Sequence, residues 1–281
     1  VLVLLEAEVT GLRNAHALRA AVTNIAGKDR VFTLLNRANR AGGLPMATMA
    51  VADQPAAARP MSAKLVALER AAALVPDGAV LAVSSSSGLN TPDAFLAALG
   101  ARFRAEGRPR GLTVVMPISA GDMYGIKGID HLAQPGMLAR VIGGSYPSGP
   151  SSFEPPRIRE MIANEEVAAW NLPSGVLFDM LRDVAAKRAG VLTKVGLGTF
   201  VDPRLDGGRM NASARPDLVR VVDFGGEEWL HVPNIVPNVG ILRGTTADED
   251  GNVSMEHEGA VLGAVDVALA VRNSGGVLIA Q

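Results

Sequence analysis

From Met61 to the end of the chain, short apolar runs of strand length alternate with segments whose apolar residues recur at helical spacing. Strands alternating with helices indicate an α/β fold, in which a layered, mostly parallel sheet carries helices on both faces. Strands are expected at 79–83, 112–116, 141–142, 168–170, 219–222, 239–242 and 277–279. Helices are expected at 62–74, 93–103, 156–163, 176–186 and 258–271.

The first 60 residues have a different pattern. An apolar run at 1–5, a helical segment at 12–26 and a strand-like run at 31–35 predict a small N-terminal β-α-β appendage. The residues that follow are rich in alanine and proline, which is typical of a linker. The predicted division is an appendage at 1–45, a linker at 46–60 and a main domain at 61–281. We expect the first 60 residues to be dispensable for the stability of the main domain.

Charge and cysteine content exclude several classes of protein. Lys and Arg number 27 against 28 for Asp and Glu, so the chain lacks the basic excess of proteins that bind nucleic acid or anionic membranes. The absence of cysteine excludes disulfides, thiolate metal sites and a cysteine nucleophile, and it is compatible with a cytoplasmic location. We read no export signal at the N-terminus and no apolar run of the roughly 18 residues that a membrane span requires.

Small-residue loops follow several expected strands, at the edge of the sheet where α/β proteins bind ligands. These loops span 84–88, 143–150, 171–175 and 197–208. Their backbone amides suit an anion or a carbonyl oxygen. The alternatives are an ordinary strand-to-helix turn for 84–88, a subunit contact for 143–150 and a hairpin closed by an Asp–Arg pair for 197–208. The Ser174 hydroxyl and the Gly175 amide can donate to an oxyanion, and the alternative for them is simple helix capping.

Side chains that carry out acid–base or metal chemistry are sparse. The four histidines are scattered without metal-ligand spacing, so we expect no metal. No G-x-S-x-G elbow is present, which argues against a serine hydrolase of that kind. Glu256 and Glu258 are interpreted as charges at the start of the last helix, where they favour the helix dipole.

Seven segments in order carry a family resemblance. They are 76–78 with 84–88, then 117–125, 142–146, 170–175, 192–204, 207–211, and 243–249 with 251–254. Through these segments residues 61–281 resemble the α-type half of the family I CoA-transferases, in particular the acetate/3-ketoacid type. The resemblance implies the α/β fold of that domain and a role in ketone body and short-chain fatty acid metabolism.

The resemblance also implies a mechanism. In this family a glutamate within E-[SN]-G-x-x-G attacks an acyl-CoA, and a glutamyl-CoA thioester then passes CoA to a carboxylic or 3-keto acid. The chain contains no such motif, and Glu258 to Gly263 is only superficially similar. We therefore expect no catalytic residue in this chain, with the nucleophile on a β-type half beyond Gln281, fused or separate. Coenzyme A is a substrate and no cofactor is implied; a homo-oligomer is expected.

The same resemblance predicts the substrate-facing residues. Ser174 stands where the family usually has glutamine in N-x-P-Q-G, although a subset of the family shares the serine, so the acceptor acid is not specified. The predicted acyl and oxyanion pocket comprises Ser119, Gly121, Gly144, Ser145, Ser174 and Gly175. A predicted CoA-binding or interface loop set comprises Ser86, Gly88, Gly198, Thr199 and Arg204.

Two other functions stay open. The first is an acyl-CoA hydrolase of the same family, with water as the acceptor. The second is a small-ligand sensing module, because sugar-phosphate isomerases and effector domains of some transcriptional regulators share this fold type. A sensor of that kind needs a helix-turn-helix, and residues 1–60 show none convincingly.

Overall fold

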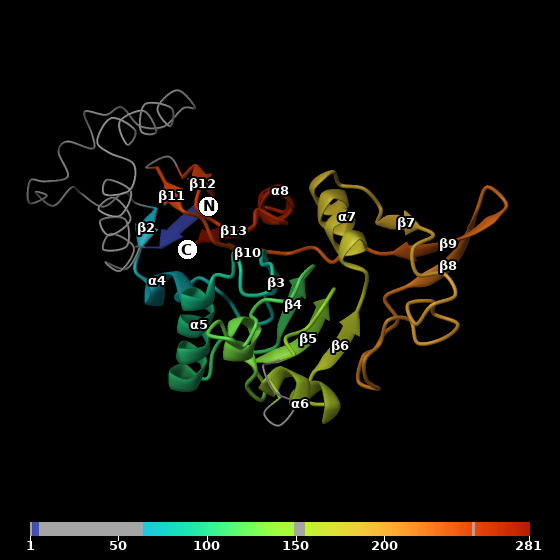
Figure 1. Ribbon diagram of the computed structural model, residues 1–281, viewed down its shortest axis with the longest axis horizontal. Helices are drawn as coiled ribbons and strands as arrows, with labels where there is room; N and C mark the ends of the chain where they lie inside the picture. Colours follow the sequence, from blue (N-terminus) through green and yellow to red (C-terminus); the bar gives the residue numbers. More distant parts are fainter. Residues whose placement is uncertain (1, 6–63, 149–154, 249–250) are drawn as a thin grey trace, which may run out of the picture. The chain divides into compact units, whose positions relative to one another are not determined.

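An eight-stranded parallel sheet forms the centre of the protein (Figure 1). The computed structural model describes Leu2–Leu5 and residues 64–148, 155–248 and 251–281. Every pair of neighbouring strands in the sheet is parallel, which confirms the expected α/β class. The order across the sheet is β2 (Leu65–Val66), β1 (Leu2–Leu5), β13 (Val277–Ala280), β10 (Val239–Leu242), β3 (Val80–Val83), β4 (Leu112–Met116), β5 (Leu138–Gly143) and β6 (Ala168–Asn171).

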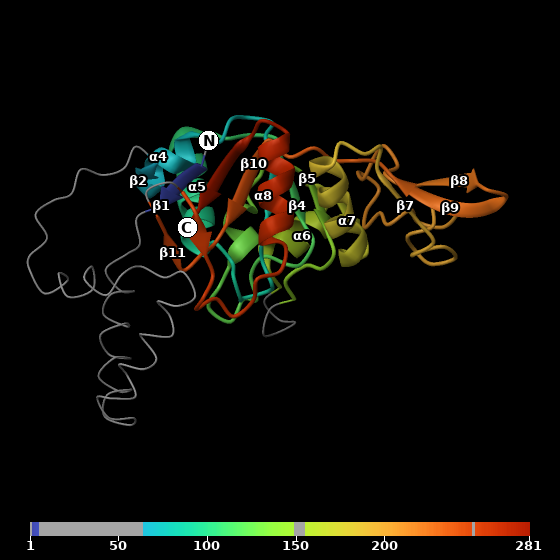
Figure 2. The same cartoon turned by 90° about the horizontal axis from the view of Figure 1, so that it is seen from above.

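Helices cover both faces of this sheet, as the sequence predicts (Figures 1 and 2). One face carries α4 (Leu68–Ala73), α5 (Asp93–Glu106), the 3-10 helix η2 (Gly128–Leu132) and α6 (Arg157–Ala163). The opposite face carries α7 (Ser174–Ala185) and α8 (Ala264–Asn273). Both faces of the sheet are therefore shielded from water by helices, which is the usual condition of a parallel sheet.

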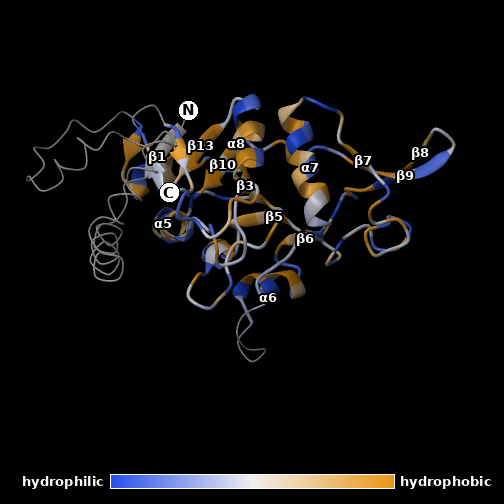
Figure 3. Ribbon diagram, turned by 45° about the horizontal axis from the view of Figure 1, so that its top comes forward, coloured by the Kyte–Doolittle hydropathy of each residue, from blue (hydrophilic) through white to orange (hydrophobic). Residues whose placement is uncertain are grey.

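The strands bury side chains on both faces because successive residues of a strand point in opposite directions. In β4, Val114 and Met116 pack in the core on the side of α5, whereas Val115 joins the core on the side of α7. In β3, Leu81 belongs to the first core and Ala82 to a core formed by α7 and α8. Strands buried in this way read as continuous apolar runs, and Figure 3 shows β10 and β13 coloured hydrophobic.

A smaller antiparallel sheet extends beyond α7 (Figures 1 and 2). Its strands lie in the order β7 (Val191–Thr193), β9 (Glu227–Val232) and β8 (Arg220–Phe224). Its buried residues, Val191, Leu230 and Val232, belong to the same core as Trp170 and Leu177. A two-stranded sheet, β11 (Thr246–Ala247) with β12 (Val253–Ser254), precedes α8. Of these five strands, the sequence pattern predicts β8 but not β7, β9, β11 or β12.

Two helix starts differ from expectation. The helix expected at 62–74 begins at Leu68, because Leu65 and Val66 form strand β2. The helix expected at 258–271 begins at Ala264, after Gly263 adopts a left-handed conformation with φ +79°.

The expectation that Glu256 and Glu258 are charges at the start of the last helix is therefore wrong. Glu256 accepts a 2.7 Å hydrogen bond from the Thr246 hydroxyl. The side chain of Glu258 is largely covered and pairs with Arg243 at 3.1 Å. Both carboxylates consequently stabilise the segment before α8 rather than the helix dipole.

The N-terminal strand lies inside the main sheet. Leu2–Leu5 forms β1, which pairs with β13 on one side and with β2 on the other. This placement differs from the separate β-α-β unit expected for residues 1–45. The segments at 12–26 and 31–35 and the linker lie outside the described residues, so the division of the chain stays a prediction.

In the part of the chain that the structure describes, none of the helices combines the length and the apolar character needed to cross a lipid bilayer.

Candidate functional site

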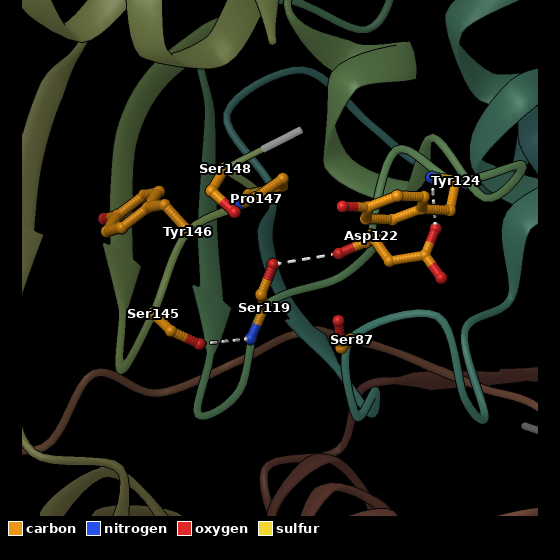
Figure 4. A pocket seen from close by; sticks show the side chains of 9 residues that line it. Ser87, Ser119, Asp122, Tyr124, Ser145, Tyr146, Pro147 and Ser148 are labelled. Carbon is orange, nitrogen blue, oxygen red and sulfur yellow. Dashed lines mark hydrogen bonds between the residues drawn. The ribbon is translucent and has the colours of Figure 1, made fainter. Parts of the chain in front are cut away.

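A cavity of about 290 Å³ lies where the loops after β3, β4 and β5 meet, at the carboxyl edge of the sheet (Figure 4). This edge is where open α/β sheets bind ligands. The described residues that line the cavity are Ser87, Ser119, Gly121, Asp122, Tyr124, Ser145, Tyr146, Pro147 and Ser148. Three predicted pocket residues, Ser119, Gly121 and Ser145, are among them.

The loop after β4 supplies one wall of the cavity. The Asp122 carboxylate accepts hydrogen bonds from the amides of Tyr124 at 2.8 Å and Ile126 at 3.4 Å, which closes a tight turn. The Ser119 hydroxyl donates to the Gly121 carbonyl at 3.1 Å. Gly121 has φ +100°, and a Cβ there would lie 2.6 Å from the Lys127 carbonyl oxygen, so only glycine fits this position.

The loop after β3 is held against the first wall by backbone hydrogen bonds. The Ser87 amide donates to the Ser119 carbonyl at 2.9 Å, and the Gly121 amide donates to the Ser87 carbonyl at 3.0 Å. Ser87 itself has a left-handed backbone with φ 58°, an uncommon conformation for a residue other than glycine. Its hydroxyl has no hydrogen-bond partner among the described residues and lines the cavity (Figure 4).

The loop after β5 forms the opposite wall. The Ser145 hydroxyl oxygen accepts a hydrogen bond from the Ser119 amide at 2.9 Å. The Tyr146 hydroxyl donates to the Trp170 carbonyl at 2.7 Å, which anchors the loop to β6. Burial raises the pKa of Tyr146, so its hydroxyl keeps its proton and remains a donor across the physiological range.

Gly144 and Ser174 adjoin the cavity without lining it. A Cβ on Gly144 would collide with the Pro117 carbonyl and would lie 3.0 Å from the Ser174 Cα, so the β5 loop rests directly on the start of α7. Ser174 is the first residue of α7 and Gly175 the second. The N-cap position is Pro173, which makes no side-chain cap, and the Ser174 hydroxyl has no partner among the residues described. Simple capping by Ser174 therefore does not describe this helix start.

The residues predicted to bind CoA or to form an interface lie in two separate places. Ser86 and Gly88 flank Ser87, and Gly88 lies directly against the Asp122 carboxylate. Gly198, Thr199 and Arg204 belong to a separate loop between β7 and β8, and none of the three lines the cavity.

Buried Asp202 organises that separate loop. Its carboxylate accepts hydrogen bonds from the Gly198 amide at 2.9 Å, the Arg204 amide at 3.0 Å and the Arg204 guanidinium at 2.8 Å. The guanidinium and the two amides hold the pKa of Asp202 well below its usual range. Arg204 also contacts Glu228 at 2.9 Å, so its charge is engaged by two acids. The loop thus has a structural explanation, and its predicted contact with CoA or another subunit stays a prediction.

Chemically, the cavity offers hydroxyls, backbone amides and one carboxylate. Ser87, Asp122, Tyr124, Tyr146, Pro147 and Ser148 were not predicted as site residues, although each lies in a loop that the sequence analysis identified. Within the described ranges, no group of three or more His, Cys, Asp or Glu side chains is arranged to hold a metal ion. The arrangement suits a small, uncharged, hydrogen-bonding ligand.

Comparison with known families identifies this architecture. Residues 65–278 match the family model described as coenzyme A transferase. A caffeate CoA-transferase of Acetobacterium woodii is 37% identical over 223 residues, which cover 78% of this chain and 40% of that protein. The acetate CoA-transferase YdiF of Escherichia coli K12 is 34% identical over 208 residues, covering 74% of this chain and 38% of YdiF. The chain thus spans about two-fifths of the length of these relatives.

Solved structures agree with the sequence relatives. The apoenzyme of YdiF from Escherichia coli O157:H7 superposes with a TM-score of 0.71 and 32% identity, over 77% of this chain and 41% of that one. A second structure of that protein is a thioester complex with CoA, with a TM-score of 0.70. The match of the family model over most of the chain, together with these relatives, shows that the protein belongs to the coenzyme A transferase family.

Proposed function

We propose that the chain is the α-type half of a CoA-transferase, which moves CoA between an acyl-CoA and a short-chain carboxylic or 3-keto acid. The observation that carries the proposal is the cavity itself: the loops that carry the family resemblance converge on it from β3, β4 and β5. The start of α7, with its uncapped amides and the Ser174 hydroxyl, adjoins the same loops through Gly144. Such donors suit the carbonyl oxygen of a thioester.

The proposed reaction uses a glutamate from a second, β-type half. Its carboxylate oxygen attacks the acyl-CoA carbonyl carbon, forming a mixed anhydride and releasing the CoA thiolate. The thiolate then attacks the glutamyl carbonyl carbon, which yields glutamyl-CoA and the free carboxylate of the first acid. The second acid takes up CoA by the same steps in reverse. In this scheme the described chain binds the acyl group, while the Ser174 hydroxyl and the early amides of α7 stabilise charge on the carbonyl oxygen.

Named relatives support the need for a second half. The first two relatives are more than twice as long as the matched stretch of this chain. An acetoacetyl-CoA:acetate/butyrate CoA transferase alpha subunit of Clostridium acetobutylicum, 23% identical, is covered over 75% of its length. A relative of comparable length is therefore named as one subunit of a transferase. The cytoplasmic location and the homo-oligomer remain predictions beside this proposal.

An acyl exchange assay with labelled acetate and acetyl-CoA tests the proposed function. We expect background exchange from the purified chain, because no E-[SN]-G-x-x-G occurs in it, and exchange once a β-type half is added. Trapping with borohydride, which reduces a glutamyl thioester, should then modify the β-type half alone. Robust exchange by the isolated chain would contradict the proposal, and release of free CoA without exchange would favour the hydrolase alternative.

A further inference from the structure

Serine and tyrosine side chains make up most of the described lining of the cavity. Four serines and two tyrosines stand among its nine described lining residues, and none of the nine is Leu, Ile, Val, Met or Phe. Ligand pockets are usually lined mainly by hydrophobic side chains, with few polar groups. The cavity of about 290 Å³ is also small. Apolar contact with an alkyl chain would come from the rings of Tyr124, Tyr146 and Pro147 alone among the described lining residues, so burial of such a chain would gain less free energy than in a pocket lined by aliphatic side chains.

Several of these hydroxyls retain hydrogen-bonding capacity. The Ser87 hydroxyl has no partner among the described residues. The Tyr146 hydroxyl is committed to the Trp170 carbonyl, and the Tyr124 side chain, 75% exposed, keeps its contact with water. Ser145 accepts from the Ser119 amide, so its own proton remains available for a ligand. An alkyl group that displaced the water from these hydroxyls would leave them unpaired, which costs binding free energy.

Asp122 sets the charge of the cavity. It is the one ionisable acid among the described lining residues, and no Lys, Arg or His stands among them. One carboxylate oxygen is committed to the amides of Tyr124 and Ile126, while the other lies against Gly88. A second carboxylate on a ligand would meet this negative charge with no compensating cation among the described lining residues, and like charges in contact are unfavourable.

From these observations we infer that the cavity selects short acyl groups bearing a hydroxyl, such as 3-hydroxyacyl groups, over plain alkanoyl groups and over dicarboxylic acyl groups. The inference rests on the proposed function, because it takes the cavity to be the acyl subsite. A hydroxyl on the acyl chain replaces the displaced water by donating to one oxygen and accepting from Ser87 or Ser145. A site that hydrogen-bonds a substrate hydroxyl discriminates strongly against the analogue that lacks it.

Calorimetric titration of the 281-residue chain with three probes tests this inference. We expect 3-hydroxybutyryl-CoA to bind at least about tenfold more tightly than butyryl-CoA, with glutaryl-CoA the weakest of the three. Ser87→Ala removes a hydroxyl without a partner among the described residues and should reduce the preference for the hydroxyl. Ser213→Ala, an exposed serine outside the cavity lining, is the matched control and should keep that preference.

Asp122→Asn tests the charge separately. The asparagine side-chain oxygen can still accept from the Tyr124 and Ile126 amides, so the turn is kept while the charge is lost. We expect this variant to bind glutaryl-CoA several-fold more tightly, with little change for butyryl-CoA. Unchanged discrimination against glutaryl-CoA would overturn the role of Asp122.

The remaining outcomes separate the inference from the proposed function. Butyryl-CoA binding as tightly as 3-hydroxybutyryl-CoA would overturn the hydroxyl preference and leave the acyl-binding role intact. If free CoA bound as tightly as 3-hydroxybutyryl-CoA and Ser87→Ala weakened both equally, the cavity would hold the CoA moiety and the inference would fall. If none of the probes bound, the assignment of the cavity as an acyl subsite would fall and the inference with it.

Discussion

Ser174 makes few structural contacts, which suits the proposed role of its hydroxyl as a donor to the substrate. It begins α7, it does not occupy the N-cap position, and its hydroxyl has no partner within the described ranges. If Ser174 acts as proposed, Ser174→Ala lowers kcat by about 10²–10³ in the chain assembled with the proposed β-type half, because one donor to the thioester oxygen is lost. The thermal midpoint of the variant should stay close to that of the wild type.

The control for this prediction is the substitution Ser174→Gln, which restores the family's usual residue and keeps a donor. It should retain more activity than Ser174→Ala. A loss of about 1 kcal/mol in unfolding free energy with unchanged kcat is instead the result expected of a helix cap. That result would remove Ser174 from the site.

Gly144 and Gly175 form a matched pair for a test of packing. A Cβ at Gly144 would overlap the Pro117 carbonyl and crowd Ser174, whereas a Cβ at Gly175 would meet no atom within 4 Å. Gly144→Ala should lower the unfolding free energy by about 1–3 kcal/mol, the usual cost of overpacking. Gly175→Ala should leave it unchanged or raise it by up to about 1 kcal/mol, because alanine favours the helix. Urea unfolding of both variants measures the difference, and equal effects would contradict the close contact of Gly144 with α7.

At the level of elements, the stability that the loop between β7 and β8 contributes to the fold should depend on pH, because the carboxylate of Asp202 holds this loop together. The hydrogen bonds are made to the carboxylate, and they hold the pKa of Asp202 in the folded protein below the ordinary value of an aspartate. The stabilisation is therefore complete above pH 4 or so and is lost as the pH falls through the lowered folded pKa. Asp202→Asn should lower the thermal midpoint at pH 7 and weaken its dependence on acid pH. Asp206→Asn, an exposed residue of the same loop, is the control; an equal effect of the two would contradict this account.

The central strands that the sequence predicted share one property, which is burial on both faces of the sheet. Strands β3, β4 and β10 are almost wholly buried and read as unbroken apolar runs, so local pattern identified them. Strand β9 was missed because Glu227, Glu228 and His231 interrupt its apolar residues, and its partner β7 has three residues. Its stability comes from pairing with segments distant in sequence, which a local pattern does not report.

For the candidate site, the sequence predicted the loops that form it but not all of the side chains that line it. The loops 84–88 and 143–150 and the segment 117–125 were identified from their small residues, and they supply the cavity walls. Which side chains face the cavity depends on backbone details such as the left-handed Ser87 and the turn closed by Asp122. Those details are set by contacts between loops, so Ser87 and Asp122 were found in the structure rather than from spacing.

At the level of the whole molecule, the two ends of the described chain support each other. Strand β1 pairs with β13 through Leu2, Val3 and Leu4 and with β2 through Leu4 and Leu5, so it joins the start of the chain to its last strand. Removal of Val1–Leu5 would leave β13 as an exposed edge and β2 without a neighbour. Exposed edges of this kind promote association between molecules.

Deletion of residues 1–5 should therefore destabilise the protein, contrary to the expectation that the N-terminal region is dispensable. At about 1 kcal/mol for each net backbone hydrogen bond, the loss amounts to a few kcal/mol in urea unfolding. Val3→Pro, which removes a single strand amide, should give a smaller loss in the same direction. Sedimentation velocity should show association of the deleted chain at concentrations where the full chain does not associate. An unchanged unfolding midpoint in both variants would contradict this prediction. It would mean that the pairing of β1 with its neighbours contributes nothing to the stability of the sheet.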